Sequence, residues 1–342
     1  MKRNFWLLLW LLLVGLVLLL AVDVFLGSVS IPFTQAWHAL WGGEAPAFVQ
    51  QIIWQFRIPK ALTALLAGMS LSVCGVQMQT LFRNPLADPY VLGISSGAGL
   101  GVALFVMGSS ALGLQALLPA PIADLGMAAA AWLGALAVTL LVMAAAQRIK
   151  NTLSLLVLGI MIGSAGSALI GLLQYLSNAS ALKLYVLWTM GSFGNVTGTR
   201  LGLMAGCCAV GLALSFYNIK DLNVLLMGEQ YAASLGIRLP RVRNRIFLAT
   251  TLLAGSVTAF CGPIGFIGIA VPHVARMVFR NANHRVLIPT SALLGAALML
   301  LADTLSQWPG SQGVLPINTV AALLGIPVII YVIFSQNKAS AL

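Results

Sequence analysis

Long uncharged stretches of apolar residues, separated by short polar segments, run through most of the chain. They do not alternate apolar with polar residues, as the strands of a membrane β-barrel do. A helix needs about 20 apolar residues to cross a hydrocarbon core about 30 Å thick, and most of these stretches approach that length. The pattern therefore predicts an all-α integral membrane protein with about ten transmembrane helices. The predicted spans cover residues 5–26, 58–81, 90–107, 126–146, 153–175, 200–217, 245–261, 266–279, 286–306 and 316–335.

The composition agrees with a membrane as the solvent. Of the 342 residues, 60% are hydrophobic and only 7% are charged, whereas a soluble domain carries about 25% charged residues. Lys2 and Arg3, followed by an apolar run, resemble the start of a signal peptide. The uncharged run Phe5–Val22 is longer than the core of a usual signal peptide, so we expect it to be a retained span.

The positive charges indicate the orientation in the membrane. With the N-terminus in the cytosol and ten alternating spans, most of the 18 lysines and arginines fall inside. Those that fall outside are Arg57, Lys60, Lys183 and Arg200. This bias follows the positive-inside rule and predicts that both termini lie in the cytosol. It also accounts for the net charge of +11 without a nucleic-acid partner.

No cluster of side chains indicates a metal site or a catalytic centre. The cysteines lack CxxC spacing and are expected to be packing residues; they are Cys74, Cys207, Cys208 and Cys261. His273 is expected to be structural, near one end of its span, and His38 and His284 fall in other segments. Of the seven acidic residues, only Asp303 is expected inside a span, and it lies near the end of that span.

Two segments resemble each other and indicate an internal repeat. Residues 63–75 (TALLAGMSLSVCG) and residues 250–262 (TTLLAGSVTAFCG) are identical at seven of thirteen positions. They fall in the second and seventh spans, which cross the membrane in opposite directions. An inverted repeat of two five-helix halves is typical of transporters.

The longest polar loop on the cytosolic side covers about residues 219–244, and its basic cluster, Arg238, Arg241, Arg243 and Arg245, flanks the seventh span. Within it we expect two short helices, 221–227 and 229–235, separated at Gly228, with Gly236 just past the end of the second helix. One interpretation is an ordinary loop whose arginines anchor a helix at the depth of the lipid phosphates. The other is a docking element that transmits a push to the spans. A motor would have to be a separate protein, because the chain has no G-x-x-x-x-G-K-[ST] nucleotide-binding motif.

Over nearly its whole length, the sequence resembles the FecCD-type permeases of ATP-binding-cassette (ABC) importers for iron–siderophore complexes, haem and vitamin B12. Together the motifs that carry the resemblance are very specific. They are RIPKALTALLAGMSLSVCGVQMQTLFRNPLADPYVLGISSGAGLG, LLMGEQYAASLG, GPIGFIGIAVPHVARM, NHRVLIPTSALLGA and LPINTVAALLGIPVIIYVIF.

The resemblance implies one transmembrane permease domain over residues 1–342, of the type II importer class, in the bacterial cytoplasmic (inner) membrane. It implies a homodimer that binds two ATPase subunits in the cytosol and a periplasmic or lipid-anchored substrate-binding protein outside. The chain itself would be no enzyme and would bind no cofactor, since the ATPase subunits use ATP and Mg²⁺. The cargo favoured is an iron(III) chelate, with cobalamin as the alternative. An ion-coupled secondary transporter is a remote alternative, because it would need ionisable coupling groups within the spans.

The resemblance also implies roles for particular residues on the cytosolic side. The segment 219–240 matches the coupling helices that contact the ATPase, and its expected core is Glu229, Ala232, Leu235 and Gly236. The turn 82–90 matches a cytosolic gate, for which Asn84 and Leu86 are the candidates. That turn is equally well interpreted as a tight connection between helices, because it contains prolines and capping residues.

Two further groups complete the predicted site. The fifth span would line the pathway through Gly159, Gly163, Ser164 and Ser167, although small residues also serve close helix packing. Arg57 and Lys60 would contact the binding protein, although both could also reach the interface as ordinary snorkelling cations. Gln307 and Val314 stand where the family often has arginine and glutamate, which puts a second docking contact in doubt.

Overall fold

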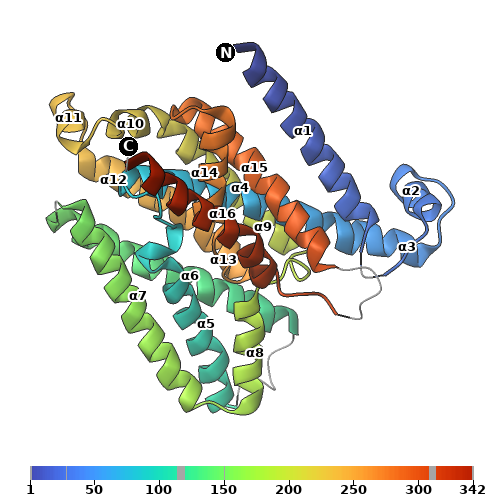
Figure 1. The fold of residues 1–342 in the computed structure, drawn as a ribbon. Coiled ribbons are helices and arrows are strands. Elements are labelled where there is room, and N and C mark those ends of the chain that lie inside the picture. The colour runs from blue at the N-terminus through green and yellow to red at the C-terminus, as the bar shows by residue number, and fades with distance from the viewer. Residues whose placement is uncertain (1, 28, 114–119, 150, 308–312, 341–342) are drawn as a thin grey trace.

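The computed structural model describes residues 2–27, 29–113, 120–149, 151–307 and 313–340, and within these ranges it contains helices and no strand. The helices form one bundle, with short helices at both ends (Figure 1). The first half contains α1 (Lys2–Phe25), α2 (Phe33–Trp41), α3 (Ala47–Gln51), the π-helix η1 (Ile52–Arg57), α4 (Ile58–Leu81), the 3₁₀-helix η2 (Pro89–Leu92), α5 (Ile94–Ala111), α6 (Ala120–Arg148), α7 (Thr152–Tyr175) and α8 (Ala179–Met190). The second half contains α9 (Thr199–Tyr217), α10 (Ile219–Leu225), α11 (Glu229–Ser234), α12 (Leu239–Thr250), the π-helix η4 (Thr251–Gly255), α13 (Ser256–Cys261), α14 (Ile267–Phe279), α15 (His284–Ser306) and α16 (Ile317–Ser340).

The predicted all-α membrane architecture is confirmed. Within the described ranges, nine helical segments are long and apolar enough to cross a membrane. They correspond to nine of the ten predicted spans, and the remaining one, predicted over 266–279, is the shorter helix α14. The chain is therefore a multi-pass membrane protein.

The structure differs from the prediction in two ways. One span begins earlier than its apolar run, and short helices lie between the predicted spans. The second span continues back from Ile58 through η1 and α3 to Ala47, because Gln50, Gln55 and Arg57 interrupt the apolar pattern without ending the helix. The helices α2 and α8 were not predicted, since both are too short to cross a membrane.

The helix α4 is the centre of the bundle, with α9, α14 and α15 packed around it. Glycine permits the closest of these approaches. A Cβ atom on Gly75 would collide with the carbonyl oxygen of Gly268 in α14, and one on Gly68 would collide with that of Gly295 in α15. Small residues allow such close backbone packing in membranes.

The connections between the spans gather at two opposite ends of the bundle (Figure 1). The α11 end contains the start of α1, the α4–η2 turn, the α6–α7 turn, α10, α11 and the α14–α15 turn. The α2 end contains α2, the start of α4 and the end of α15. In Figure 1, α16 ends on the side of the bundle that contains α10 and α11, so both ends of the described chain lie at the α11 end.

The two segments of the predicted repeat occupy different parts of their helices. Thr63–Gly75 lies inside α4, whereas Thr250–Gly262 runs from the end of α12 through η4 and α13. Gly262, with φ 79°, ends α13. The inverted relation of the two halves stays a prediction.

Candidate functional site

The short helix α11 is joined to two spans by a partly buried ion pair. Glu229, the first residue of α11, accepts a hydrogen bond from Arg243 Nη2 of α12 at 2.8 Å. It also accepts one from the hydroxyl of Thr152, the first residue of α7. Arg243 is only 4% exposed and donates further to the Ile149 carbonyl at 3.4 Å. Because these bonds share their atoms, α11, α12 and the start of α7 form one connected unit.

The backbone at both ends of α11 requires glycine. Gly228 has φ 107° and Gly236 has φ 82°, values that side chains with a Cβ rarely adopt. At the end of the helix, the Ile237 N–H donates to the Ala232 carbonyl at 3.1 Å, which satisfies a terminal acceptor. The prediction of two short helices around Gly228 is confirmed, with α10 beginning two residues earlier than expected.

The predicted coupling residues divide into two kinds in this structure. Ala232 is completely buried and anchors α11, while Leu235 is 57% exposed. Met227 and Tyr231 are also more than half exposed, so three large apolar side chains point away from the bundle at one tip. We call Met227, Tyr231 and Leu235 the α11 tip. Exposed apolar clusters of this kind mark interaction surfaces.

A cavity of about 730 Å³ separates α11 from the predicted gate turn. Its walls include Arg83 of the α4–η2 turn, Thr152 and Glu229. Arg83 has φ 47°, an unusual conformation for a residue with a Cβ atom. The two predicted cytosolic elements therefore face each other across this cavity.

The gate turn is held by its own capping side chains, as the sequence predicted. Asn84 Oδ1 accepts a hydrogen bond from the Leu86 N–H at 2.9 Å, and Asp88 Oδ1 accepts one from the Tyr90 N–H at 2.8 Å. Burial raises the pKa of the Asp88 carboxyl to about 6, and the bond from Tyr90 opposes that shift. Leu86 is 41% exposed, so an apolar side chain projects from a rigid turn.

Two side chains of α14 hold the gate turn and the last turn of α4 that leads into it. His273 Nε2 donates to the carbonyl of Pro85 at 2.8 Å, which confirms the prediction of a structural histidine. Arg276 Nη1 donates to Gln79 Oε1 at 2.6 Å, and the Gln79 amide donates to the Gly268 carbonyl at 3.3 Å. A movement of α14 would therefore move the gate turn with it.

The predicted pathway residues lie on different faces of α7. Gly159 is buried, and a Cβ there would lie 2.6 Å from the carbonyl oxygen of Val91 in η2. Gly163 is half-buried beside Ser96 of α5. Ser164 and Ser167 are exposed. The two glycines therefore serve packing, while the two serines belong to a face that this single chain leaves open.

At the α2 end, the Arg57 side chain is turned into the protein. Its guanidinium donates to the carbonyls of Val24 at 3.1 Å, Phe25 at 2.8 Å and Val29 at 2.6 Å, where the chain leaves α1. The residue is only 7% exposed. Arg57 therefore fixes the connection after α1 rather than reaching outward as a snorkelling cation.

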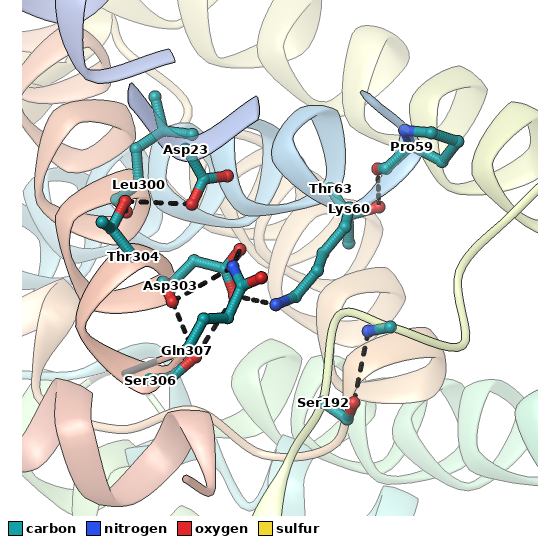
Figure 2. Close-up of polar contacts among 11 residues, drawn as sticks. Asp23, Pro59, Lys60, Thr63, Ser192, Leu300, Asp303, Thr304, Ser306 and Gln307 are labelled. Atoms are coloured by element: carbon teal, nitrogen blue, oxygen red, sulfur yellow. Dashed lines mark hydrogen bonds and ion pairs between the residues drawn. The ribbon is translucent and has the colours of Figure 1, made fainter. Parts of the chain in front are cut away.

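Lys60 lies in a buried polar cluster between α1, α4 and α15, shown in Figure 2. Its ammonium is 3.0 Å from Asp303 Oδ1, and Gln307 Nε2 donates to Asp303 Oδ2 at 3.0 Å. Beside them, the Thr304 hydroxyl donates to Asp23 Oδ1 at 3.0 Å. The expectation that Asp303 is the only acidic residue inside a span was wrong, because Asp23 is buried in α1.

The structure brings the predicted docking residues together with Gln307 and Val314, the two positions at which this sequence differs from the pattern common in the family. Arg57, Lys60, Gln307 and Val314 all line one cavity of about 310 Å³ at the α2 end. Gln307 is turned inward onto Asp303, and Val314 is 55% exposed. The cavity wall is therefore positively charged behind a partly apolar rim.

Sequence reasoning missed three functional partners in these clusters. Arg243 was assigned to a basic cluster at the membrane surface, yet it is buried against Glu229. Thr152 and Asp23 were not singled out. A lone acid in an apolar run, as Asp23 is, signals a buried partner, whereas nothing in the sequence around Thr152 indicates its contact with α11.

The described residues contain no metal-binding cluster of three or more His, Cys, Asp or Glu side chains. Cys74, Cys208 and Cys261 are buried free thiols within helices, in agreement with their predicted packing role.

Comparison with known proteins gives one consistent result. The model of the FecCD transport family matches residues 12–335. The chain is 34% identical to the haemin transport system permease protein HmuU of Yersinia pestis over 329 residues, which cover 96% of each chain. It is 37% identical to the vitamin B12 import system permease protein BtuC of Salmonella typhi over 330 residues, again 96% of each. A solved metal-chelate-type ABC transporter in an inward-facing conformation superimposes with a TM-score of 0.82 at 29% identity, covering 96% of this chain and 99% of that one.

Proposed function

The chain belongs to the FecCD transport family, and from that premise we propose that it moves an iron(III) chelate, a siderophore complex or haem, across the bacterial cytoplasmic membrane. It is a permease subunit of an ABC importer, and not itself the ATPase. In the proposed cycle, a separate ATPase subunit hydrolyses ATP with Mg²⁺, and this chain alternates between access to the two sides. In this proposal the chemistry of ATP belongs to the ATPase subunit, and this chain contributes the pathway and the lever.

The observation that carries this proposal is the connection of α11 to the spans. A force on the α11 tip reaches α12 and α7 through Glu229, Arg243 and Thr152, because these side chains are bonded to one another. The hydrogen bonds of buried charged groups resist separation more than exposed ones do. The segment 219–240 is therefore suited to act as the lever between a cytosolic ATPase and the pathway.

We place the α11 end in the cytosol, with both termini. The bias of lysine and arginine towards this end supports that orientation. The gate residues Asn84 and Leu86 then close the cytosolic mouth of a pathway lined by Ser164 and Ser167 of α7. A second copy of the chain supplies the opposite wall, two ATPases bind the α11 tips, and the binding protein docks at the α2 end.

Vitamin B12 is the second candidate cargo. The B12 permeases match this chain at 37% identity, at least as well as the haemin permease does at 34%. The described residues form no metal-ligand cluster that would select one chelate by direct coordination. We therefore expect cargo choice to reside mainly in the binding protein.

Reconstitution of the complete transporter tests the function and the cargo together. Proteoliposomes that contain this chain, its ATPase and its binding protein are supplied with a labelled iron(III)–siderophore complex or labelled haem. They should hydrolyse ATP faster than they do without cargo, and they should accumulate the labelled cargo. Stimulation by cobalamin alone would replace the iron-chelate assignment. Uptake driven by an ion gradient in liposomes without the ATPase would overturn the importer mechanism.

The docking proposal predicts a modest, specific loss for Arg57→Gln. Glutamine keeps a donor for the surrounding carbonyls but removes the positive charge behind the cavity. We expect binding-protein affinity to fall by roughly two- to fivefold, the range of a partly screened ion pair of about 0.5–1 kcal/mol. Surface plasmon resonance on the protein in nanodiscs measures this affinity. The control is Lys183→Gln, at an exposed position of α8. Equal affinities for Arg57→Gln and the parent would exclude Arg57 from docking, and basal ATP hydrolysis should not change.

A further inference from the structure

A second cavity at the α11 end lies away from the gate turn and the α11 tip, where three spans reach the surface. Its volume is about 600 Å³. Its wall is formed by the last turn of α9, the start of α10, Arg245 of α12 and Arg285 at the start of α15. Since α9 ends at Tyr217 and α15 begins at His284, the cavity is at the level where these spans leave the hydrocarbon.

The cavity has an excess of positive charge. Lys220, Arg245 and Arg285 line it together with one acid, Asp221. Arg245 Nη2 lies 2.5 Å from Asp221 Oδ2, so that pair is neutral as a unit. Among the described residues, no hydrogen-bond or ion-pair partner faces the ammonium of Lys220 or the guanidinium of Arg285. Two cations therefore remain available to an anion.

The positive cavity opens beside an apolar surface. Phe216 and Tyr217 form its α9 wall and are 46% and 68% exposed. The Tyr217 ring lies 5.0 Å from the Arg245 guanidinium carbon, which fixes both side chains at the mouth. Leu203 and Val210 are both more than half exposed and precede Tyr217 at seven-residue intervals, so the three lie on one face of α9. An apolar stripe thus leads from the bilayer to the cavity.

We infer that this cavity binds the phosphate headgroup of an anionic membrane phospholipid, with an acyl chain along the Leu203–Val210–Tyr217 face. The cations supply the charge that a phosphodiester requires, and basic pockets between helices at the cytosolic surface recognise such headgroups. Free inorganic phosphate would make no use of the apolar stripe. An acidic side chain of the ATPase would also leave the apolar stripe on α9 unused, because the apolar side chains that we propose to contact the ATPase lie on α11.

The site also connects the lipid to the segment that we propose as the lever. Lys220 and Asp221 belong to α10, and Asn223 of the same helix donates to Asn283 Oδ1 at 3.0 Å, at the start of α15. A bound headgroup bridges Lys220 of α10 and Arg285 of α15, and so stabilises the position of α10. The binding site itself does not depend on the identity of the cargo or on the lever role.

Native mass spectrometry of the purified chain tests the site with phosphatidylglycerol and phosphatidylcholine as probes. We expect the parent protein to retain phosphatidylglycerol preferentially. The double variant Lys220→Gln/Arg285→Gln should lose that preference by on the order of tenfold, since each cation near a membrane surface contributes appreciably to anionic-lipid binding. The matched control is Arg238→Gln/Arg241→Gln, which removes the same charge from exposed positions at the same end but outside the cavity.

The outcomes separate the possible occupants. Equal losses in both double variants would show diffuse attraction and overturn the site. Displacement of phosphatidylglycerol by excess inorganic phosphate would assign the cavity to a free anion instead of a lipid. Retained lipid preference together with lost ATPase assembly in the cavity variant would assign the cavity to the ATPase.

If the cavity variant fails to fold, a photoreactive phosphatidylglycerol on the parent protein decides. Label on peptides containing Tyr217 or Arg285 supports the site, and label elsewhere refutes it.

Discussion

Gly236→Pro abolishes uptake while the protein still inserts into the membrane: this is the expected result of blocking the end of α11. Gly236 has φ 82°, whereas proline is fixed near −65°. The substitution also removes the N–H that donates to the Ala233 carbonyl at 3.0 Å. A misplaced proline costs about 3 kcal/mol or more, which would leave the native end of α11 in fewer than about one molecule in a hundred. Uptake in proteoliposomes and ATPase pull-down measure the effect.

A matched glycine distinguishes this effect from general damage. Gly113 follows α5, has φ 68°, and its N–H donates to the Ser110 carbonyl at 3.1 Å. Gly113→Pro therefore imposes a similar strain away from α11, and we expect it to retain most uptake. Deletion of residues 228–236 should resemble Gly236→Pro. Normal uptake by either α11 variant would refute the lever role of the segment 219–240.

The spans were predictable because their signal is local. A run of about 20 apolar residues defines a membrane helix without knowledge of its neighbours. The short helices near the membrane surfaces have no such signal. The helix α2, for example, exposes Phe33, Trp37 and Trp41 on nine residues, and these aromatics are typical of the membrane interface rather than of a span.

The direction of charged side chains could not be predicted, because it depends on partners distant in sequence. Arg57 finds carbonyls about 30 residues earlier, and Lys60 pairs with Asp303 on a helix near the other end of the chain. The local sequence around Arg57 and Lys60 would fit equally well with both side chains reaching outward to solvent. The turn at Asn84 was predictable in detail, since asparagine and aspartate cap their own neighbours within two residues.

Lys60→Met should destabilise the protein more than any single change at its surface. Asp303 is 1% exposed and its ion-pair partner in the described structure is Lys60, while Asp23, 3% exposed, lies in the same cluster (Figure 2). Removing one partner of a buried ion pair costs about 3–5 kcal/mol, because the other charge is left uncompensated. We expect the melting temperature of the detergent-solubilised protein to fall by many degrees. Lys183→Met, on exposed α8, is the control and should leave it nearly unchanged.

The double variant Lys60→Met/Asp303→Leu decides whether the loss comes from the uncompensated charge. Replacing both partners by apolar groups removes that charge, and buried pairs replaced in this way often cost little. The double variant should therefore be more stable than Lys60→Met alone, and the non-additivity of the thermodynamic cycle measures the pair. Additive losses would mean that Lys60 stabilises α4 through its hydrocarbon stem. In that case, the cluster in Figure 2 would be a packing contact rather than an electrostatic one.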